Sequence, residues 1–157
     1  MSILPANIED AQIINQIKTA AFRDEKARFG PWKDKGQGPK WYMDEWFNDI
    51  NETGRLIQEF YFFKLVENGE IIGCFWLHDV DEHTIQLEDF CIDPKHQGKG
   101  YGYETLLAME ELFPLKQKWI LGTPFYSVRN HHLYEKAGYG KVGETAENMV
   151  FLYEKKK

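Results

Sequence analysis

The sequence predicts an α/β protein of the α+β type, with a mixed, mostly antiparallel central sheet of six to seven strands and helices on both faces. Three observations support this class. Two hairpin patterns follow one another in the middle of the chain, and a third closes it. Between them, a predicted helix joins two strands, and strands that are joined by a helix usually lie parallel.

The first predicted elements are a short strand and a helix. The strand is Ile3-Leu4, followed by Pro5. Asn7 can cap the helix, which is predicted to end near Phe22. The helix carries an apolar face made of Ile13, Ile14, Ile17 and Ala21.

An aromatic concentration then follows a predicted loop over Arg23–Gln37. A second helix is predicted from Pro39, and it carries Trp41, Tyr42, Trp46 and Phe47. Aromatic residues at helical spacing usually pack in a core. The alternative is an acceptor pocket in which Trp32, Tyr42 and Trp46 contact the substrate, with Asp24, Asp44 and Glu45 at the rim.

The central strands are predicted from turn chemistry. Apolar runs at Tyr61–Glu67 and Ile71–Leu77 flank Asn68-Gly69, the dipeptide best suited to a two-residue type I′ hairpin. A second turn near Asp81-Glu82 leads into the strand His83–Ile92. The later elements are a helix at Tyr103–Phe113, a strand at Lys118–Gly122, a helix at Ser127–Lys136 capped by left-handed Gly138, and a hairpin of Tyr139–Glu144 and Met149–Tyr153.

A glycine-rich stretch joins the strand that ends at Ile92 to the next helix. Its glycines alternate with other residues, in the order Gly98, Lys99, Gly100, Tyr101, Gly102. At a strand-to-helix junction, backbone N–H groups can point outward together and the helix dipole adds partial positive charge, which favours a phosphorylated ligand. The glycines alone are equally compatible with a tight turn.

Composition restricts the partners. The chain has 157 residues and 43% apolar content, which suits a single domain over 1–157. A net charge of −6 argues against nucleic-acid binding and suits a cationic partner. No apolar stretch approaches the roughly 20 residues of a membrane span, so a cytoplasmic protein without membrane association is expected. Cys74 and Cys91 lie in apolar runs and are predicted to be buried thiols.

Two motifs resemble the GNAT superfamily of N-acetyltransferases. Its acetyl-CoA loop has the pattern Gln/Arg-x-x-Gly-x-Gly/Ala, which Gln97, Gly100 and Gly102 match. A second family feature places an Asn and then a Tyr, a basic residue, a small residue, Gly and an aromatic residue on the later helix, matched by Asn130, Tyr134, Lys136, Ala137, Gly138 and Tyr139. The resemblance is good over 57–153, and residues 1–56 match only in a two-helix outline.

The resemblance implies acetyl-CoA as co-substrate. The amides from Gln97 to Gly102 would hold the pyrophosphate, and the pantetheine arm would lie along a strand that splays from its parallel neighbour. The implied donor-binding residues are Phe90, Ile92, Gln97, Gly98, Lys99, Gly100, Tyr101, Gly102, Asn130, Tyr134 and Lys136. Residues 57–153 would form the acetyl-CoA-binding core and 1–56 the acceptor-side helices. The five histidines show no metal spacing, so no metal is expected.

Three residues are candidates for proton transfer. Glu88 and Asp89 share a strand and should lie on opposite faces by the period-two rule. The run Leu87-Glu88-Asp89-Phe90 resembles the diamine and polyamine acetyltransferases, in which the matching Glu is a proposed general base. Tyr134 is the candidate acid, because a phenol with a pKa near 10 can protonate a thiolate. Otherwise the acids are solvent-facing strand residues and Tyr134 packs on the sheet.

The resemblance therefore implies an N-acetyltransferase that moves an acetyl group to a primary amine by direct attack in a ternary complex. A small cationic amine such as a polyamine is the expected acceptor, with Glu88 and Asp89 near it. Acetylation of a protein N-terminus or lysine, and a non-catalytic acyl-CoA sensor, are the alternatives. A dinucleotide-binding fold is disfavoured, since its glycine fingerprint should follow the first strand. Many relatives pair, so a homodimer is one expected assembly.

Overall fold

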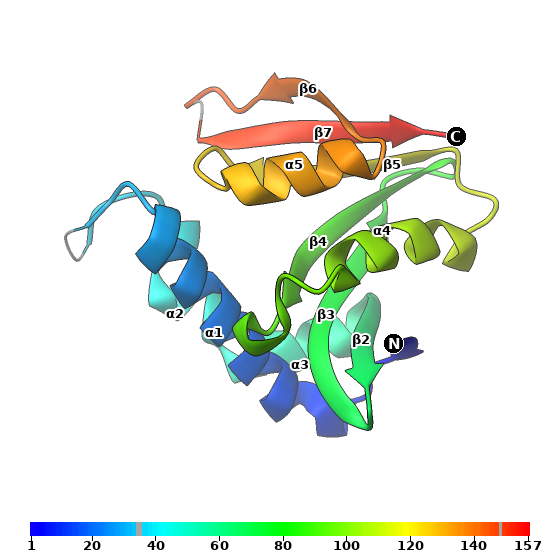
Figure 1. Cartoon of the computed structure of the whole chain (residues 1–157), viewed down its shortest axis with the longest axis horizontal. Coiled ribbons are helices and arrows are strands. Elements are labelled where there is room, and N and C mark those ends of the chain that lie inside the picture. Colours follow the sequence, from blue (N-terminus) through cyan, green and yellow to red (C-terminus); the bar gives the residue numbers. More distant parts are fainter. Residues whose placement is uncertain (34–35, 148) are drawn as a thin grey trace. The chain divides into compact units, whose positions relative to one another are not determined.

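The computed structural model describes residues 1–33, 36–147 and 149–157 (Figure 1). Residues 34–35 of the predicted Arg23–Gln37 loop and residue 148 in the closing hairpin lie outside this description. The elements are β1 (Ser2–Pro5), the 3₁₀ helix η1 (Ile8–Asp10), α1 (Ala11–Phe29), η2 (Lys40–Tyr42), α2 (Asp44–Phe47), α3 (Ile50–Glu59), β2 (Tyr61–Glu67), β3 (Glu70–Asp79), β4 (Thr84–Ile92), η3 (Pro94–His96), α4 (Tyr101–Leu112), β5 (Lys118–Pro124), α5 (Val128–Lys136), β6 (Gly140–Glu144) and β7 (Val150–Lys156).

The strands form one seven-stranded sheet in the order β1-β2-β3-β4-β5-β7-β6. β1 pairs antiparallel with β2, and β7 pairs antiparallel with both β5 and β6, whereas β4 and β5 are parallel. The parallel ladder runs from Thr84↔Lys118 to Leu87↔Leu121, although both strands continue beyond it. This topology confirms the predicted mixed, mostly antiparallel fold class.

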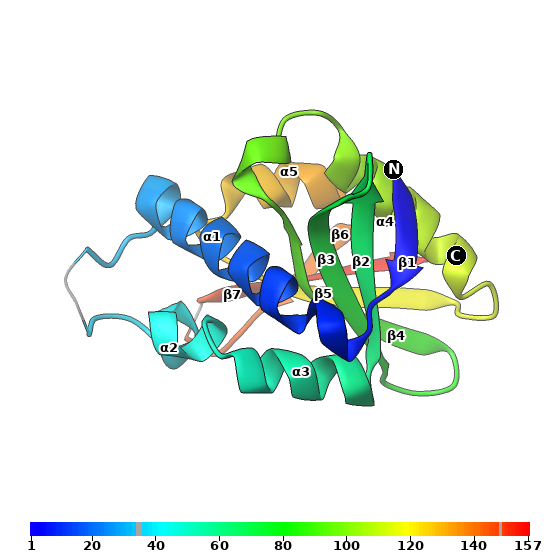
Figure 2. The same cartoon turned by 90° about the horizontal axis from the view of Figure 1, so that it is seen from below.

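The chain divides into two compact units. Unit 1 contains Met1–Trp76 and Asp89–Gln97, and unit 2 contains Leu77–Glu88 and Gly98–Lys157. In unit 1, α1 and α3 lie against the strands (Figure 2). The cluster that joins them consists of Ala11, Ile14, Ile17 and Ala21 of α1, Leu56 and Ile57 of α3, Phe62 of β2, Cys74 of β3 and Cys91 of β4. Both cysteines are free, buried thiols, as predicted.

Two predictions for the first helix are wrong. The first helix does not end near Phe22 but continues to Phe29, because Glu25 is buried and Asp24 pairs with Arg28 one turn later at 3.5 Å. Ile13, expected on its buried face, is 46% exposed.

The helix predicted from Pro39 is instead three short pieces, η2, α2 and α3. The chain leaves helical geometry between α2 and α3, where Asn48 has φ −99° and ψ 66°. Asp49 then begins α3, and its side chain accepts hydrogen bonds from the N–H groups of Asn51 and Glu52. An aspartate in this position caps a new helix, which is why the earlier one does not continue.

Unit 2 contains the parallel ladder and the closing hairpin. Its fully buried side chains include Ile85 of β4 and Leu106 and Met109 of α4. α5 packs against β7, since the ring of His131 stacks on those of Phe151 and Tyr153 at centroid distances of 5.1 and 5.8 Å.

The turns follow their predicted chemistry. Asn68 and Gly69 have φ values of +50° and +77°, as a type I′ hairpin requires. At the second turn, the Asp81 carboxylate accepts hydrogen bonds from the N–H groups of His83 and Thr84, both at 2.8 Å. Gly138 closes α5 with φ +100°.

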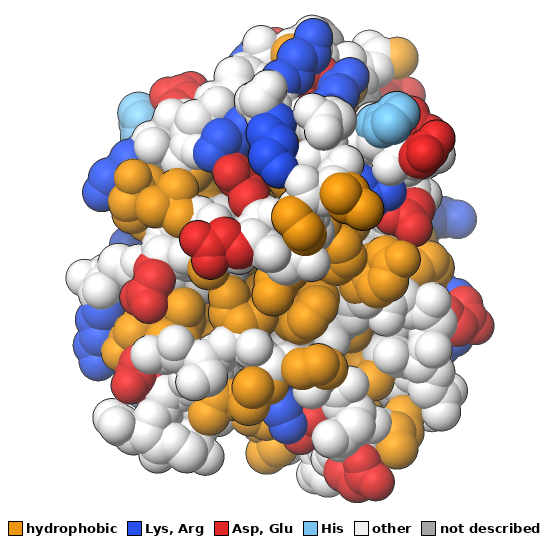
Figure 3. All heavy atoms as spheres, turned by 90° about the vertical axis from the view of Figure 1, so that its right-hand side faces the viewer, with side chains coloured by type: hydrophobic (Ala, Val, Ile, Leu, Met, Phe, Trp, Pro, Cys, Tyr) orange, Lys and Arg blue, Asp and Glu red, His pale blue; other side chains and the backbone are white. Residues whose placement is uncertain are grey.

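The exposed surface carries charges of both signs. One face shows basic and acidic side chains interspersed around exposed hydrophobic ones (Figure 3). None of the helices within the described ranges is both long enough and apolar enough to cross a membrane.

Candidate active site

The glycine loop has left-handed backbone at two positions. Gly98 has φ +77° and Gly100 has φ +86°, and a Cβ at either position would have no atom within 4 Å. Gly100 is the N-cap residue of α4. α4 begins at Tyr101, two residues earlier than predicted, so Gly102 belongs to the helix. The loop backbone before α4 is therefore open, and only glycine adopts these φ values readily.

Gln97 connects this loop to the end of β4. Its side-chain Nε2 donates to the carbonyl oxygen of Ile92 at 2.9 Å. Just before it, the Asp93 carboxylate accepts from the N–H of Lys95 at 3.1 Å and so starts η3. Lys99 is exposed, whereas Tyr101 is half-buried.

The predicted donor-side residues of α5 lie in unit 2. Tyr134 is 6% exposed, with its ring between those of Tyr139 and Tyr153 at centroid distances of 6.1 and 6.0 Å. Asn130 is half-buried within the first turn, and Ser127 is the N-cap residue. The Lys136 Nζ lies 4.5 Å from the ring centroid of Tyr103 on α4.

β4 contains a bulge at Asp89. Val80 donates to Thr84 on one side of it and Asp93 donates to Ile72 on the other. Between these bonds β4 has eight residues, 85–92, whereas β3 has seven, 73–79. Asp89 itself has φ +47°, which is uncommon for a residue other than glycine. The extra residue interrupts the alternation of side chains.

The prediction that Glu88 and Asp89 lie on opposite faces is therefore wrong. Asp89 accepts a hydrogen bond from Trp76 Nε1 at 2.9 Å, whereas Glu88 Oε1 lies 3.4 Å from His78 Nε2. Trp76 and His78 are two residues apart in β3 and share one face. Phe90 follows the bulge, with its ring edge-on to that of Phe75.

The two acids have different partners. The Oε1 atom of Glu88 also accepts from Gln86 Nε2 at 2.6 Å, and its side chain is 33% exposed. The Oδ2 atom of Asp89 lies 3.3 Å from the Nζ of Lys18, whose side chain is only 5% exposed. Burial would lower the pKa of Lys18, but the charge of Asp89 and the neighbouring thiols raise it overall. Asp89 is thus paired with a buried lysine, although its own side chain is 32% exposed.

Sequence reasoning missed Lys18, Trp76, His78 and Gln86. Lys18 had a usable signal, because it lies four residues after Ile14 and three before Ala21, within the apolar stripe of α1. A buried lysine on such a stripe needs a partner for its charge. Its partner, Asp89, is 71 residues away in sequence, so nothing local could identify it.

The predicted acceptor aromatics are only partly brought together. The rings of Trp32 and Tyr42 meet edge-to-face at 4.9 Å, and the Tyr42 hydroxyl donates to the Trp32 carbonyl oxygen. Trp46 is 61% exposed. The Lys26 Nζ lies 4.5 Å from the Tyr42 ring centroid, so the Tyr42 ring already contacts a cationic side chain.

Among the acidic residues predicted at the rim of the acceptor pocket, Asp44 has a strong hydrogen-bond partner. Arg23 hydrogen-bonds to Asp44, and this bond holds the pKa of Asp44 below its usual value despite partial burial. Across the described residues, no three His, Cys, Asp or Glu side chains are arranged to hold a metal ion.

The sequence matches the acetyltransferase (GNAT) family over residues 18–139, which is most of the chain. The chain therefore belongs to this family of acyl-transferring enzymes. This confirms the resemblance seen in Gln97, Gly100 and Gly102. No curated protein matches the chain in sequence.

Several solved structures share the fold. A GNAT-family acetyltransferase from Streptococcus agalactiae has a TM-score of 0.82 at 18% identity, over 99% of this chain and 95% of that one. PaiA N-acetyltransferase from Thermoplasma acidophilum, in complex with coenzyme A, has a TM-score of 0.77 at 18% identity, over 99% and 98%. Spermidine N-acetyltransferase from Vibrio cholerae, in complex with CoA and spermine, has a TM-score of 0.69 at 15% identity, over 98% and 93%.

Proposed function

We propose that this acetyltransferase moves an acetyl group from acetyl-CoA to a primary amine by direct attack in a ternary complex, and that the amine is a small cation such as a polyamine. The observation that carries the proposal is the pair of left-handed glycines, Gly98 and Gly100, open to solvent directly before α4. This backbone suits an anion at the helix N-terminus. The complexes of two fold relatives with coenzyme A support this choice of donor.

Donor binding is assigned to the loop, the end of β4 and α5. The amides between Gln97 and Tyr101 bind the pyrophosphate, and the half-buried Gly102 lets the helix start lie close to it. Gln97 keeps the loop attached to β4 through the Ile92 carbonyl, as its 2.9 Å bond indicates. Lys99 and Lys136 add positive charge, while Phe90, Ile92 and Asn130 contact the pantetheine arm.

Glu88 is assigned as the proton acceptor. Its carboxylate is partly exposed and hydrogen-bonded by Gln86, with His78 nearby, so it can receive a proton directly or through water. The Asp89 carboxylate instead forms an ion pair with Lys18 and accepts a hydrogen bond from Trp76. Of the two acids named from sequence, only Glu88 therefore retains a role in proton transfer, and Asp89 has a structural one.

Tyr134 is assigned as the acid for the departing thiolate. In the reaction the amine nitrogen forms a bond to the acetyl carbon and the carbon–sulfur bond breaks. The first ammonium proton passes to Glu88 before attack, and the phenolic proton of Tyr134 passes to sulfur as the carbon–sulfur bond breaks. The second proton, which the nitrogen loses on becoming an amide, returns Tyr134 to its phenol form directly or through water. A buried tyrosine among other aromatic rings is shielded from bulk water, which favours transfer to the sulfur over transfer to solvent.

The cationic acceptor is supported by charge and by aromatic residues. The net charge of −6 favours approach of a cation. Trp32 is half-buried and lies edge-to-face with Tyr42, which is itself buried with Lys26 over its ring, so Trp32 is the aromatic residue of this pair that is placed to meet an ammonium group. A fold relative from Vibrio cholerae is a spermidine N-acetyltransferase.

A thiol-release assay with acetyl-CoA tests the function. Polyamines, aminoglycosides, amino acids and peptides serve as acceptors, and polyamines are expected to give the highest kcat/KM. Glu88→Gln should lower kcat/KM by roughly 10²- to 10⁴-fold. Calorimetry should show that CoA binding is retained. Glu111→Gln, an exposed acid on α4, is the matched control.

Two other outcomes would redirect the assignment. Peptides acetylated in preference to every small amine would indicate a protein N-terminus or lysine as the acceptor. No thiol release with any acceptor, combined with tight CoA binding, would indicate an acyl-CoA sensor.

A further inference from the structure

We propose that Lys18 is a positioning residue of the acetyl transfer: its buried ammonium group holds Asp89, and through Asp89 the bulge in β4 that aims Glu88. The inference rests on the proposed function, because Glu88 needs to be aimed only if it takes a proton from the acceptor.

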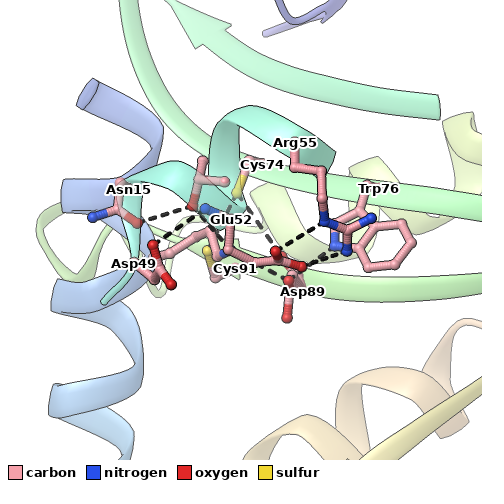
Figure 4. Close-up of polar contacts among 10 residues, drawn as sticks. Asn15, Asp49, Glu52, Arg55, Cys74, Trp76, Asp89 and Cys91 are labelled. Carbon is pink, nitrogen blue, oxygen red and sulfur yellow. Dashed lines mark hydrogen bonds and ion pairs between the residues drawn. The ribbon is translucent and has the colours of Figure 1, made fainter. Parts of the chain in front are cut away.

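Lys18 is held rigidly inside unit 1. Besides Asp89, its Nζ has a partner in the Oγ1 of Thr53 on α3, at 3.4 Å. The Thr53 hydroxyl donates to Asn15 Oδ1 at 2.9 Å, so its oxygen lone pairs face the ammonium group. The close-up shows Asn15, Cys74, Cys91 and Asp89 gathered at this place (Figure 4). Lys18 is therefore held in place by α1, to which it belongs, and by its contact with α3, in addition to its contact with Asp89.

The charge of Lys18 needs Asp89. Among the groups around its Nζ, only Asp89 is a carboxylate within ion-pair distance in the described residues, and the thiols of Cys74 and Cys91 are weak acids with an Sγ–Sγ distance of 3.6 Å. A buried ammonium group without a paired anion is strongly unfavourable. The attraction between Lys18 and Asp89 therefore acts directly on residue 89.

Asp89 needs its partners for a different reason. Its φ of +47° is uncommon for residues with a Cβ, although aspartate adopts it more readily than alanine does. Two donors from different elements, Lys18 Nζ of α1 and Trp76 Nε1 of β3, both contact its Oδ2 atom. These bonds exist only while the side chain stays at the bulge, so they stabilise the left-handed backbone there.

The bulge determines where Glu88 points. With one extra residue in β4, Glu88 meets Gln86 and His78, as its bonds show. If residue 89 relaxed to ordinary strand geometry, the side-chain alternation would change at this point of the strand. Glu88 would then no longer have both partners. Loss of Lys18 should accordingly disturb proton transfer more than donor binding.

The test distinguishes an effect of the backbone conformation at residue 89 from an effect of the Lys18–Asp89 charges. Lys18→Met removes the ammonium group and should lower kcat by roughly 10- to 100-fold, with KM for acetyl-CoA changed less than about 3-fold. Adding Asp89→Gly should restore kcat to within about 3-fold, because glycine adopts positive φ freely and leaves no unpaired carboxylate at this position. Adding Asp89→Ala instead should not restore it, because alanine removes the carboxylate but resists positive φ.

Backbone NMR of ¹⁵N-labelled protein provides a readout independent of turnover. Amide shifts of residues 86, 87, 91 and 92, which exclude the substituted position and its immediate neighbours, should return to wild-type positions in Lys18→Met/Asp89→Gly and stay displaced in Lys18→Met/Asp89→Ala. If the wild type releases no thiol, the proposed function fails while this measurement still decides the Lys18–Asp89 linkage.

The proposal is overturned if Lys18→Met leaves kcat unchanged, or if Ala and Gly at position 89 restore it equally. Circular dichroism establishes that each variant is folded at the assay temperature. Should Lys18→Met not fold, Trp76→Phe removes the second donor to Asp89 without leaving a buried charge. A several-fold lower kcat with displaced amides at residues 86, 87, 91 and 92 would then support the proposal, and unchanged values would refute it.

Discussion

Tyr134 and Tyr139 are two buried tyrosines whose hydroxyl groups are assigned different roles. The rings lie 6.1 Å apart, and both residues are less than a tenth exposed. The Tyr139 hydroxyl is buried with no hydrogen-bond partner in the described part of the chain. Burial raises the pKa of Tyr139, with a further contribution from Glu110. Tyr139 is thus a packing residue, whereas Tyr134 is the proposed acid.

Tyr134→Phe should lower kcat by roughly 10²- to 10⁴-fold, because the thiolate must then leave without a proton donor. KM for acetyl-CoA should change little. Tyr139→Phe is the matched control: it should keep activity and leave the free energy of unfolding equal or higher, since it removes an unpaired buried hydroxyl. Thiol release and thermal unfolding measure both. Equal turnover of Tyr134→Phe and wild type across pH would contradict the acid role.

At the scale of elements, the loop before α4 combines two requirements on its glycines. Left-handed φ disfavours residues with a Cβ on conformational grounds, and the open space around Gly98 and Gly100 lets a ligand approach the backbone. Substitutions at these positions are therefore expected to affect both stability and donor affinity.

Gly100→Ala should destabilise the fold by about 1 kcal/mol and weaken CoA binding by roughly 10-fold, because the backbone must keep a left-handed conformation that alanine disfavours. Gly140→Ala in β6 is the control, since that position also has open space but no positive φ. Calorimetric titration with CoA measures the affinities. The loop assignment would be wrong if both variants bound CoA like the wild type.

Elements defined by local turn chemistry could be predicted, and those defined by distant partners could not. Asn68-Gly69 specifies its hairpin within two residues, so the prediction was correct. The left-handed conformation of Asp89 has no comparable signal, because it depends on Lys18 from another element. The end of α1 was misplaced because its charged last turns look like loop sequence, although Glu25 is buried there.

The same distinction between local signals and distant partners applies to the residues of the candidate site. The glycine motif and Tyr134 could be named because both belong to motifs that resemble those of the GNAT family. The separate roles of Glu88 and Asp89 could not, because alternation along a regular strand places them on opposite faces. Only the extra residue in β4 changes this, and its effect appears when both strands are aligned by their hydrogen bonds.

For the molecule as a whole, the negative net charge should affect the two substrates differently. KM for a polyamine should rise several-fold when ionic strength increases from about 0.05 to 0.5 M, because salt screens the attraction between the protein and a polycation. KM for a monoamine should change less, and this comparison is the control. Steady-state kinetics at constant pH measure both. An equal salt response for the two amines would exclude long-range attraction as a basis of acceptor choice.

The division of the chain into interleaved units has a consequence for how the protein can be cut and engineered. The chain passes between the units three times, at 76–77, 88–89 and 97–98. No single truncation can release either unit as a continuous fragment. Each unit needs a peptide from within the span of the other, so expressing the N-terminal half alone would omit the Asp89–Gln97 segment. Insertions and breaks should therefore be kept out of residues 76–98, where the chain passes between the units.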